Sequence, residues 1–276
     1  MTWHAQLDID YQASAGRTVA HHTHTGPLRV LQSLYPEGEA ICHNVLVHPP
    51  GGLVGGDTLT INVRSCGTAH SLITTPGATR FYRSSGEAAI QRCHLTLEDQ
   101  ARLEWLPLEA LAFNDCRAEN HLTLSLAPQA EFMGWDVTAF GLPLAQQPFE
   151  KAQFLQHIEV PGVWLERGLI RAEDHRLMNS PLGLAGQRCM ASLFFVAGSK
   201  LERNRRAQAL DVAREVIEKH ELRLSAGATS PDGQVVIVRV LAPVVEPAMN
   251  LLQQVWVSWR QHFWAMPSTP PRIWST

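Results

Sequence analysis

A glycine-rich segment shows the most unusual spacing of chemically active residues in this chain of 276 residues. It reads HPPGGLVGGDT over residues 48–58, and its glycines and final threonine have the spacing of the phosphate-binding pattern GxxxxGKS or GxxxxGKT. Asp57 stands where that pattern needs a lysine, so its negative charge repels phosphate, and a strand-like pattern follows where a helix is required. The sequence therefore predicts that the chain binds neither GTP nor ATP.

Asp57 then has two interpretations. A carboxylate in a tight β connection commonly accepts hydrogen bonds from its own loop, whereas a carboxylate at a water-filled path can hold a cation. Asp136 and Glu166 raise the same question, because both lie in otherwise apolar strand patterns where a lone charge is costly. For Glu166, an ion pair with an arginine is the default explanation.

Histidine pairs are the other candidate metal ligands. His22 and His24 lie on one face if their segment is a strand, and two imidazoles can bind Ni²⁺, Zn²⁺ or Cu²⁺. A surface pair without a third ligand is more often incidental. A mainly β metal-dependent hydrolase built on His22, His24 and a carboxylate is still an alternative, and it needs three fixed ligands and an open coordination position.

The charge balance and the hydropathy exclude several classes of protein. With 23 basic and 26 acidic residues, the net charge of −3 argues against a nucleic-acid-binding protein, and a hydrophobic fraction of 45% excludes a large disordered one. No apolar run approaches the roughly 18 residues of a membrane helix, and the first residues lack the pattern of an export signal. We therefore expect a cytoplasmic protein without nucleic-acid or membrane partners.

The five cysteines form an odd set without a CxxC pair. This fits reduced thiols and excludes a zinc ribbon or a fully paired disulfide framework. The first three intervals between them are 24, 27 and 23 residues. Near-regular intervals are one sign of stacked structural repeats, although four positions are few to establish one.

Short runs with period-two alternation, separated by proline and glycine turns, predict strands over the first two thirds of the chain. We expect a sandwich, barrel or stacked β architecture in one domain, 1–276. Two later segments with an apolar stripe, residues 204–221 and 247 to about 264, predict α-helices in the C-terminal third. The predicted strands are 28–34, 40–48, 59–63, 70–75, 88–97, 102–106, 119–126, 131–140 and 234–241.

Several motifs, in this order along the chain, resemble the urease accessory protein family UreD, also called UreH. The glycine-rich segment and TPGATRFYRS over residues 75–84 are the most specific of them, and the resemblance runs nearly end to end. Two residues depart from the family pattern. Leu108 stands where the family's Leu-Pro-Gln-Glu has glutamine. Leu142 stands where the family's Leu-Gly-Arg has arginine, and the loss of that arginine bears on a local ion pair or a partner contact. The other matching motifs are GPL at 26–28, YPE at 35–37, CH at 42–43, LEWLP at 103–107 and PPRIW at 270–274.

The resemblance implies a urease maturation factor that is not an enzyme, with a mainly β, β-helix-like stacked fold and two α-helices. It implies that the chain binds the urease apoprotein and forms a complex with UreF and the GTPase UreG. GTP hydrolysis in UreG then drives nickel into the urease active site, with UreE as the indirect nickel donor. No tightly bound cofactor is implied, and Ni²⁺ is expected only in transit.

Four residues are our candidates for that transit: Asp57, Asp136, Glu166 and Thr79. A bare divalent ion pays several kcal/mol or more at each dry step through a protein. A conduit must therefore be wet and must hold the ion weakly, through oxygen or nitrogen ligands at intervals. A purely structural chaperone that opens urease without touching nickel is a further interpretation.

The last predicted helix is crowded with aromatic side chains, among them Trp256, Trp259, Phe263 and Trp264. A small core has little room for all of them. We therefore expect some to face a partner, with UreF at the C-terminal region.

Overall fold

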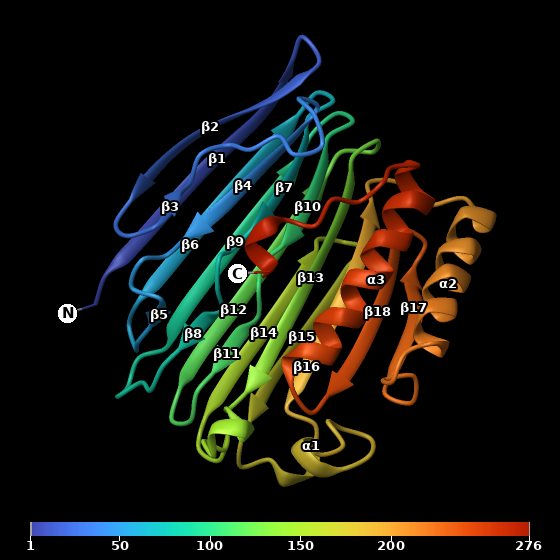
Figure 1. Ribbon diagram of the computed structural model, residues 1–276. Helices are drawn as coiled ribbons and strands as arrows, with labels where there is room; N and C mark the ends of the chain where they lie inside the picture. The colour runs from blue at the N-terminus through green and yellow to red at the C-terminus, as the bar shows by residue number, and fades with distance from the viewer. Residues whose placement is uncertain (1, 276) are drawn as a thin grey trace.

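Two stacked β-sheets and a layer of helices make up the computed structural model, which describes residues 2–275 (Figure 1). The strands are β1 (His4–Ser14), β2 (Arg17–Thr25), β3 (Arg29–Val30), β4 (Ile41–Val47), β5 (Gly52–Leu53), β6 (Thr58–Cys66), β7 (His70–Thr74), β8 (Thr79–Phe81), β9 (Ala89–Leu97), β10 (Arg102–Leu106), β11 (Ala110–Ala112), β12 (Arg117–Leu126), β13 (Glu131–Phe140), β14 (Gln153–Val160), β15 (Trp164–Arg171), β16 (Cys189–Ala197), β17 (Ala226–Asp232) and β18 (Val235–Ala242). The helices are α1 (His175–Asn179), α2 (Arg203–Glu218) and α3 (Val245–Trp264), with short 3₁₀ turns η1 (Pro143–Ala145) and η2 (Arg272–Ser275).

The first sheet has the strand order β15-β14-β12-β9-β6-β1-β2, and the second follows β17-β18-β16-β13-β10-β7-β4-β3, with β5, β8 and β11 attached to it. The chain crosses repeatedly between the sheets, so strands β6, β9, β12 and β14 stack in parallel in one sheet and β4, β7, β10 and β13 in the other. This confirms the mainly β, β-helix-like stacked architecture.

The stacking repeat does not follow the cysteines. Ile61 pairs with Cys93, and Cys93 pairs with Leu122, so one rung takes about 30 residues. Cys42 lies on β4 of the second sheet, whereas Cys66 ends β6 of the first. The cysteine intervals of 24, 27 and 23 residues therefore do not mark the rungs.

The second sheet contributes side chains to two hydrophobic cores, one on each of its faces, as strand β13 shows. Phe132 and Phe140 belong to the core between the two sheets, whereas Met133 and Trp135 belong to the core between the second sheet and the helices. Successive side chains of a strand point to opposite faces, and here both faces are buried. A polar residue on β13 at the parity of Phe132 must therefore lie between the sheets.

The two long helices lie where the apolar stripes predict them, and α3 covers β13, β16 and β18 (Figure 1). The expectation that aromatic residues of this helix face a partner is wrong. Trp256 and Trp259 are fully buried, and Phe263 and Trp264 are only 7% exposed. The second sheet and the segment after α3 enclose the helix, and together they provide a larger core than its own sequence suggests.

The C-terminal segment folds back over the second sheet after α3 (Figure 1). Trp274 lies against Trp135 and Trp256, with ring centroids 5.2 and 5.6 Å away. Its Nε1 donates a hydrogen bond of 2.8 Å to the Thr74 hydroxyl on β7. The segment thereby fixes α3 to the middle of the sheet.

A buried ionic network also connects α3 to the second sheet. Arg260 is fully buried and donates to Glu37 at 2.7 Å, and its Nη2 lies 3.2 Å from Glu104. His43 pairs with Glu37 at 2.9 Å, and His70 pairs with Glu104 at 2.8 Å. Each buried charge therefore has a partner, as burial requires.

Several elements differ from the sequence-based expectation. The segment 28–34 forms only the short strand β3, the segment 229–233 contributes to β17 instead of a turn, and α1 is a third helix. Strands β1, β2, β14 and β16 were not predicted, and β15 was indicated only by the strand pattern around Glu166. On β1 the signal is present, because Ala5, Leu7, Ile9 and Tyr11 alternate with exposed or half-buried residues.

Candidate functional site

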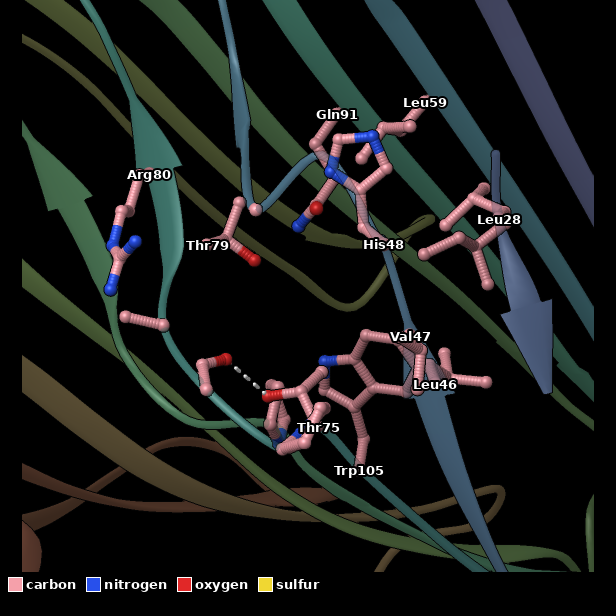
Figure 2. A pocket seen from close by; sticks show the side chains of 16 residues that line it. Leu28, Leu46, Val47, His48, Leu59, Thr75, Thr79, Arg80, Gln91 and Trp105 are labelled. Atoms are coloured by element: carbon pink, nitrogen blue, oxygen red, sulfur yellow. Dashed lines mark hydrogen bonds between the residues drawn. The ribbon is translucent and has the colours of Figure 1, made fainter. Parts of the chain in front are cut away.

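A cavity of about 210 Å³ lies between the two sheets beside the glycine-rich segment. Figure 2 shows His48, Gln91 and Thr79 around one side of it and Trp105 on the other. A smaller cavity of about 30 Å³ shares Thr79, Gln91 and Trp105 with the first and reaches Asp136. The two cavities thus follow one another from the glycine-rich segment into the space between the sheets.

A row of amide side chains continues from these cavities across the first sheet. Gln91 on β9 pairs with Asn120 on β12, and Asn120 pairs with Gln156 on β14. All three therefore lie at the same position along neighbouring strands, which we call one level of the sandwich. The amide of Gln91 donates to the Asn120 carbonyl oxygen at 3.1 Å. Parallel stacking in register therefore turns single polar residues on separate strands into a continuous polar row.

Asp136 faces this row from the second sheet. Its Oδ2 accepts a hydrogen bond from Asn120 at 2.9 Å, and its Oδ1 accepts from Gln156 at 2.5 Å and from the Thr138 hydroxyl at 3.2 Å. Burial raises the pKa of Asp136 to about 6, with Glu166 adding to the rise and the three donors opposing it. The group therefore ionises close to neutral pH, inside the sandwich.

Arg239 occupies this level at the far side of the second sheet, whereas Glu166 on β15 pairs with Ile158, two residues along β14 from Gln156. Asp136 on β13 pairs with Ser192 on β16, and Ser192 pairs with Arg239 on β18. The Arg239 guanidinium forms an ion pair with the Glu166 carboxylate of the first sheet, with Nε at 3.1 Å from Oε2. This confirms the ion-pair interpretation of Glu166, and the pair joins the two sheets.

Asp57 differs from the other three candidates. It is 1% exposed, and its oxygens accept hydrogen bonds from the backbone N–H of Val54 at 3.0 Å and of Trp3 at 3.4 Å. It lines neither cavity. It does act on His48, whose pKa is lowered by burial while the Asp57 charge opposes that change. Thr79 and Asp136 therefore line one small inter-sheet cavity, and the charge of Glu166 acts on Asp136. Asp57 instead holds the loop that carries His48.

We call the following set the polar track: Thr79, the amides of Gln91, Asn120 and Gln156, the carboxylate of Asp136 and the ion pair of Glu166 with Arg239. Its chemistry is that of separate, weak ligands. It offers a hydroxyl, three amides and carboxylates on different strands. Within residues 2–275 no three side chains of His, Cys, Asp or Glu converge as a metal site. Oxygen ligands presented one or two at a time suit a hydrated divalent cation that is bound and released.

His22 and His24 on β2 do not form the site that a metal-dependent hydrolase needs. Both are exposed, with ring centroids 6.4 Å apart, and the Arg29 guanidinium lies 3.1 Å from Nδ1 of His24. Among the residues that the structure describes, no third ligand joins them.

Sequence reasoning missed most of the polar track. Asn120 lies at the parity of Leu122 on its strand, and Gln156 lies at the parity of Ile158, both on the buried face. Arg239 likewise lies at the parity of the buried Ile237. An amide or a charge at a position that the alternation assigns to the core is the signal that identifies such residues.

The comparison with known proteins decides the family. The model of the UreD urease accessory protein family matches residues 4–275 of this chain. The chain belongs to the UreD family. It is 69% identical over 275 residues to a protein named Urease accessory protein UreD from a Polaromonas species and 70% identical to one of the same name from Polaromonas naphthalenivorans. A protein of that name from Methylibium petroleiphilum is 45% identical over 296 residues, and each of these matches covers 100% of both chains.

Membership in the UreD family confirms the resemblance that the motifs indicate and implies a role in urease maturation. Each of these relatives is named a urease accessory protein. No helix within the described residues combines the length and the apolar character needed to cross a lipid bilayer.

The two departures from the UreD pattern lie in different places. Leu108 lines the smaller inter-sheet cavity next to Asp136. Leu142 lies outside the polar track, on the wall of a separate cleft with Glu109.

Proposed function

We propose that this protein is a nickel-insertion chaperone through which Ni²⁺ passes on its way to the urease active site. The observation that carries the proposal is the in-register row of Gln91, Asn120 and Gln156, which meets Asp136 between the sheets. Such a row is costly in a sandwich core unless its polar atoms are used. It supplies a side-chain oxygen atom on each of three neighbouring strands of the first sheet.

Asp136 is the main ligand in this proposal. With a pKa of about 6 it is mostly ionised at neutral pH. Without a cation, the amides of Asn120 and Gln156 donate their N–H groups to it. Rotation of either amide by half a turn presents its carbonyl oxygen instead, so the same side chains can satisfy either the empty or the cation-bound carboxylate.

The entrance in this proposal is the cavity beside the glycine-rich segment, where Thr79 offers a hydroxyl. Glu166 is the acidic group at the far end. Asp57 contributes indirectly by fixing the loop around His48.

The proposal includes the partners that the family resemblance implies. The chain binds the urease apoprotein and acts with UreF and the GTPase UreG in the cytoplasm, and UreE supplies the nickel. Nucleotide chemistry belongs to UreG, because Asp57 replaces the lysine that a phosphate-binding loop requires. The chain itself holds no resident cofactor and catalyses no reaction in this scheme.

The test compares the nickel content of urease with the yield of the assembled complex. We expect Asp136→Asn, Thr79→Val and Glu166→Leu to lower nickel loading several-fold while the complex still assembles. Thr123→Val is the matched control for Thr79→Val, because Thr123 lies on the outer face of β12, away from the core. It should leave nickel loading unchanged.

Asp57→Leu should behave differently, since it removes the acceptor of two backbone N–H groups. We expect it to lower the yield of folded chain or of complex. Normal loading with normal assembly in Asp136→Asn and Thr79→Val would exclude the conduit and favour a purely structural chaperone. Failed assembly in either variant would assign that residue to structure.

A further inference from the structure

An apolar cleft of about 240 Å³ lies beside the start of α3, and none of its lining residues lines the two inter-sheet cavities. It is formed where the chain leaves β13 into η1 and where β18 leads into α3. Its apolar walls come from Leu111, Ala139, Leu142, Pro143, Val244 and Val245.

Two glutamates line this apolar cleft, Glu109 half-buried and Glu246 exposed in the first turn of α3. Neither forms an ion pair with another residue of 2–275. Burial raises the pKa of the Glu109 carboxyl and the Glu246 charge adds to this, whereas a hydrogen bond from the Glu109 backbone and the Arg80 charge oppose it. A half-buried carboxylate without an ion-pair partner would be stabilised by a cation that entered the cleft.

The one arginine that lines the cleft does not provide that cation. The Arg188 guanidinium is committed to the backbone oxygen of Gln187 at 3.0 Å and to the side-chain oxygen of Asn179 at 3.2 Å. The negative charge of the two glutamates instead acts on the buried Cys189 thiol, whose pKa is raised to about 12, first by burial.

The rim of the cleft carries an exposed apolar residue. Leu144, in η1, is 84% exposed, and Gln146 after it adopts the left-handed backbone conformation with φ of 56°. Leu144 therefore presents a large apolar side chain to solvent on the same cleft that the two carboxylates line. An exposed apolar group on an apolar cleft whose carboxylates have no ion-pair partner is typical of a protein contact.

We propose that this cleft receives a lysine or arginine side chain of a partner protein, which packs its methylene stem on the apolar walls and brings its cationic head to Glu109 and Glu246. Long basic side chains combine these two surfaces. Leu144 packs against the same partner at the rim. That the partner is urease or one of its maturation proteins rests on the proposed function, whereas the chemistry of the cleft does not.

Photo-crosslinking in the assembled complex tests the proposal directly. A photoreactive residue replaces Leu144 in the full chain, which is purified with the urease apoprotein and the other accessory proteins, and the crosslinked peptide is identified by mass spectrometry. We expect a peptide of a partner that contains lysine or arginine at or beside the crosslinked position. Leu182 is the matched control position, because it is 97% exposed and does not line the cleft.

Charge variants provide the second measurement. Glu109→Gln combined with Glu246→Gln should weaken retention of that partner about tenfold or more, because one side of a desolvated charge pair is lost. Leu142→Arg should weaken it as well, since it places a cation of this chain on the wall of the cleft. The control is Glu215→Gln combined with Glu218→Gln on the exposed face of α2, which should leave retention unchanged.

The outcomes separate this proposal from the conduit. Loss of retention in the Glu109 and Glu246 variant, with normal nickel per assembled complex, supports the cleft, whereas Asp136→Asn should show the reverse pattern. A crosslink to a second copy of this chain, a crosslinked peptide without a basic residue, or unchanged retention in the double variant would each overturn the proposal.

Discussion

Replacement of Arg260 by methionine should destabilise the protein strongly. The guanidinium is fully buried and donates to both oxygens of Glu37 at 2.7 and 3.2 Å and to the Pro267 carbonyl at 2.6 Å. Methionine keeps an unbranched apolar stem and the helical preference but removes the guanidinium. It leaves the buried carboxylates of Glu37 and Glu104 without their cation.

The expected loss follows from that geometry. Removing one partner of a buried pair costs about 3–5 kcal/mol, since the remaining charge stays desolvated. For a chain of this size, each kcal/mol lowers the midpoint of thermal unfolding by about 2–4 °C. We therefore expect Arg260→Met to lower the midpoint by about 10 °C. Arg203→Met, at an exposed position of α2, is the control and should change it little.

The stability lost in Arg260→Met should depend on pH. Burial alone would raise the pKa of Glu37, but hydrogen bonds from His43 and Arg260 outweigh it and hold that pKa below its ordinary value. A lowered pKa contributes stability above the ordinary range of a glutamate and loses it as the pH falls. The deficit of Arg260→Met should therefore shrink as the pH is lowered towards 4, where the carboxyls of the variant can take up protons.

Thermal unfolding of the purified chain, followed by circular dichroism at several pH values, is the assay. The triple variant Arg260→Met, Glu37→Gln, Glu104→Gln should recover part of the loss, because it removes the uncompensated charges together with the cation. A midpoint for Arg260→Met within about 2 °C of the parent would refute the reasoning, since it corresponds to less than about 1 kcal/mol. A triple variant less stable than Arg260→Met would also contradict it.

Two further predictions concern the polar track and the C-terminal segment. The folded-state pKa of Asp136, about 6, lies above the ordinary value of an aspartate, so its ionisation increasingly opposes folding as the pH rises from that ordinary value through about 6. Asp136→Asn should therefore raise the unfolding midpoint at pH 8, and the difference should vanish near pH 4. An equal gain at both pH values would contradict this. Deletion of residues 267–276 removes the Trp274 contacts and the Pro267 acceptor of Arg260, so the midpoint should fall by several degrees; an unchanged midpoint would show that the segment is dispensable for α3.

The strands and helices with a clear pattern could be predicted from the sequence. The predicted ranges 102–106 and 131–140 coincide with β10 and β13, and the two apolar stripes coincide with α2 and α3 within a few residues. Edge strands were harder to predict from the sequence. On β2 most residues are exposed, so that strand lacks the alternation that burial on one face imposes.

The candidate site could be predicted only in part. Asp136 and Glu166 stand out because a charged residue in an apolar strand pattern is visible in the sequence, and Thr79 stands out because it lies in the motif of residues 75–84. Which of them meet was not visible, because Asn120 and Gln156 reach Asp136 from other strands. The correct partner of Glu166 is Arg239, 73 residues along the chain.

The sequence by itself therefore determined the local structure, the family and the residues whose polarity conflicts with burial. Each of these depends on neighbours within a few positions or on the order of the motifs along the chain. The tertiary structure alone decided that Gln91, Asn120 and Gln156 share one level and that Glu109 and Glu246 line one cleft. The reason is register: the loops between rungs set which residues of separate strands face each other, and a shift of one position would turn each polar side chain to the opposite face.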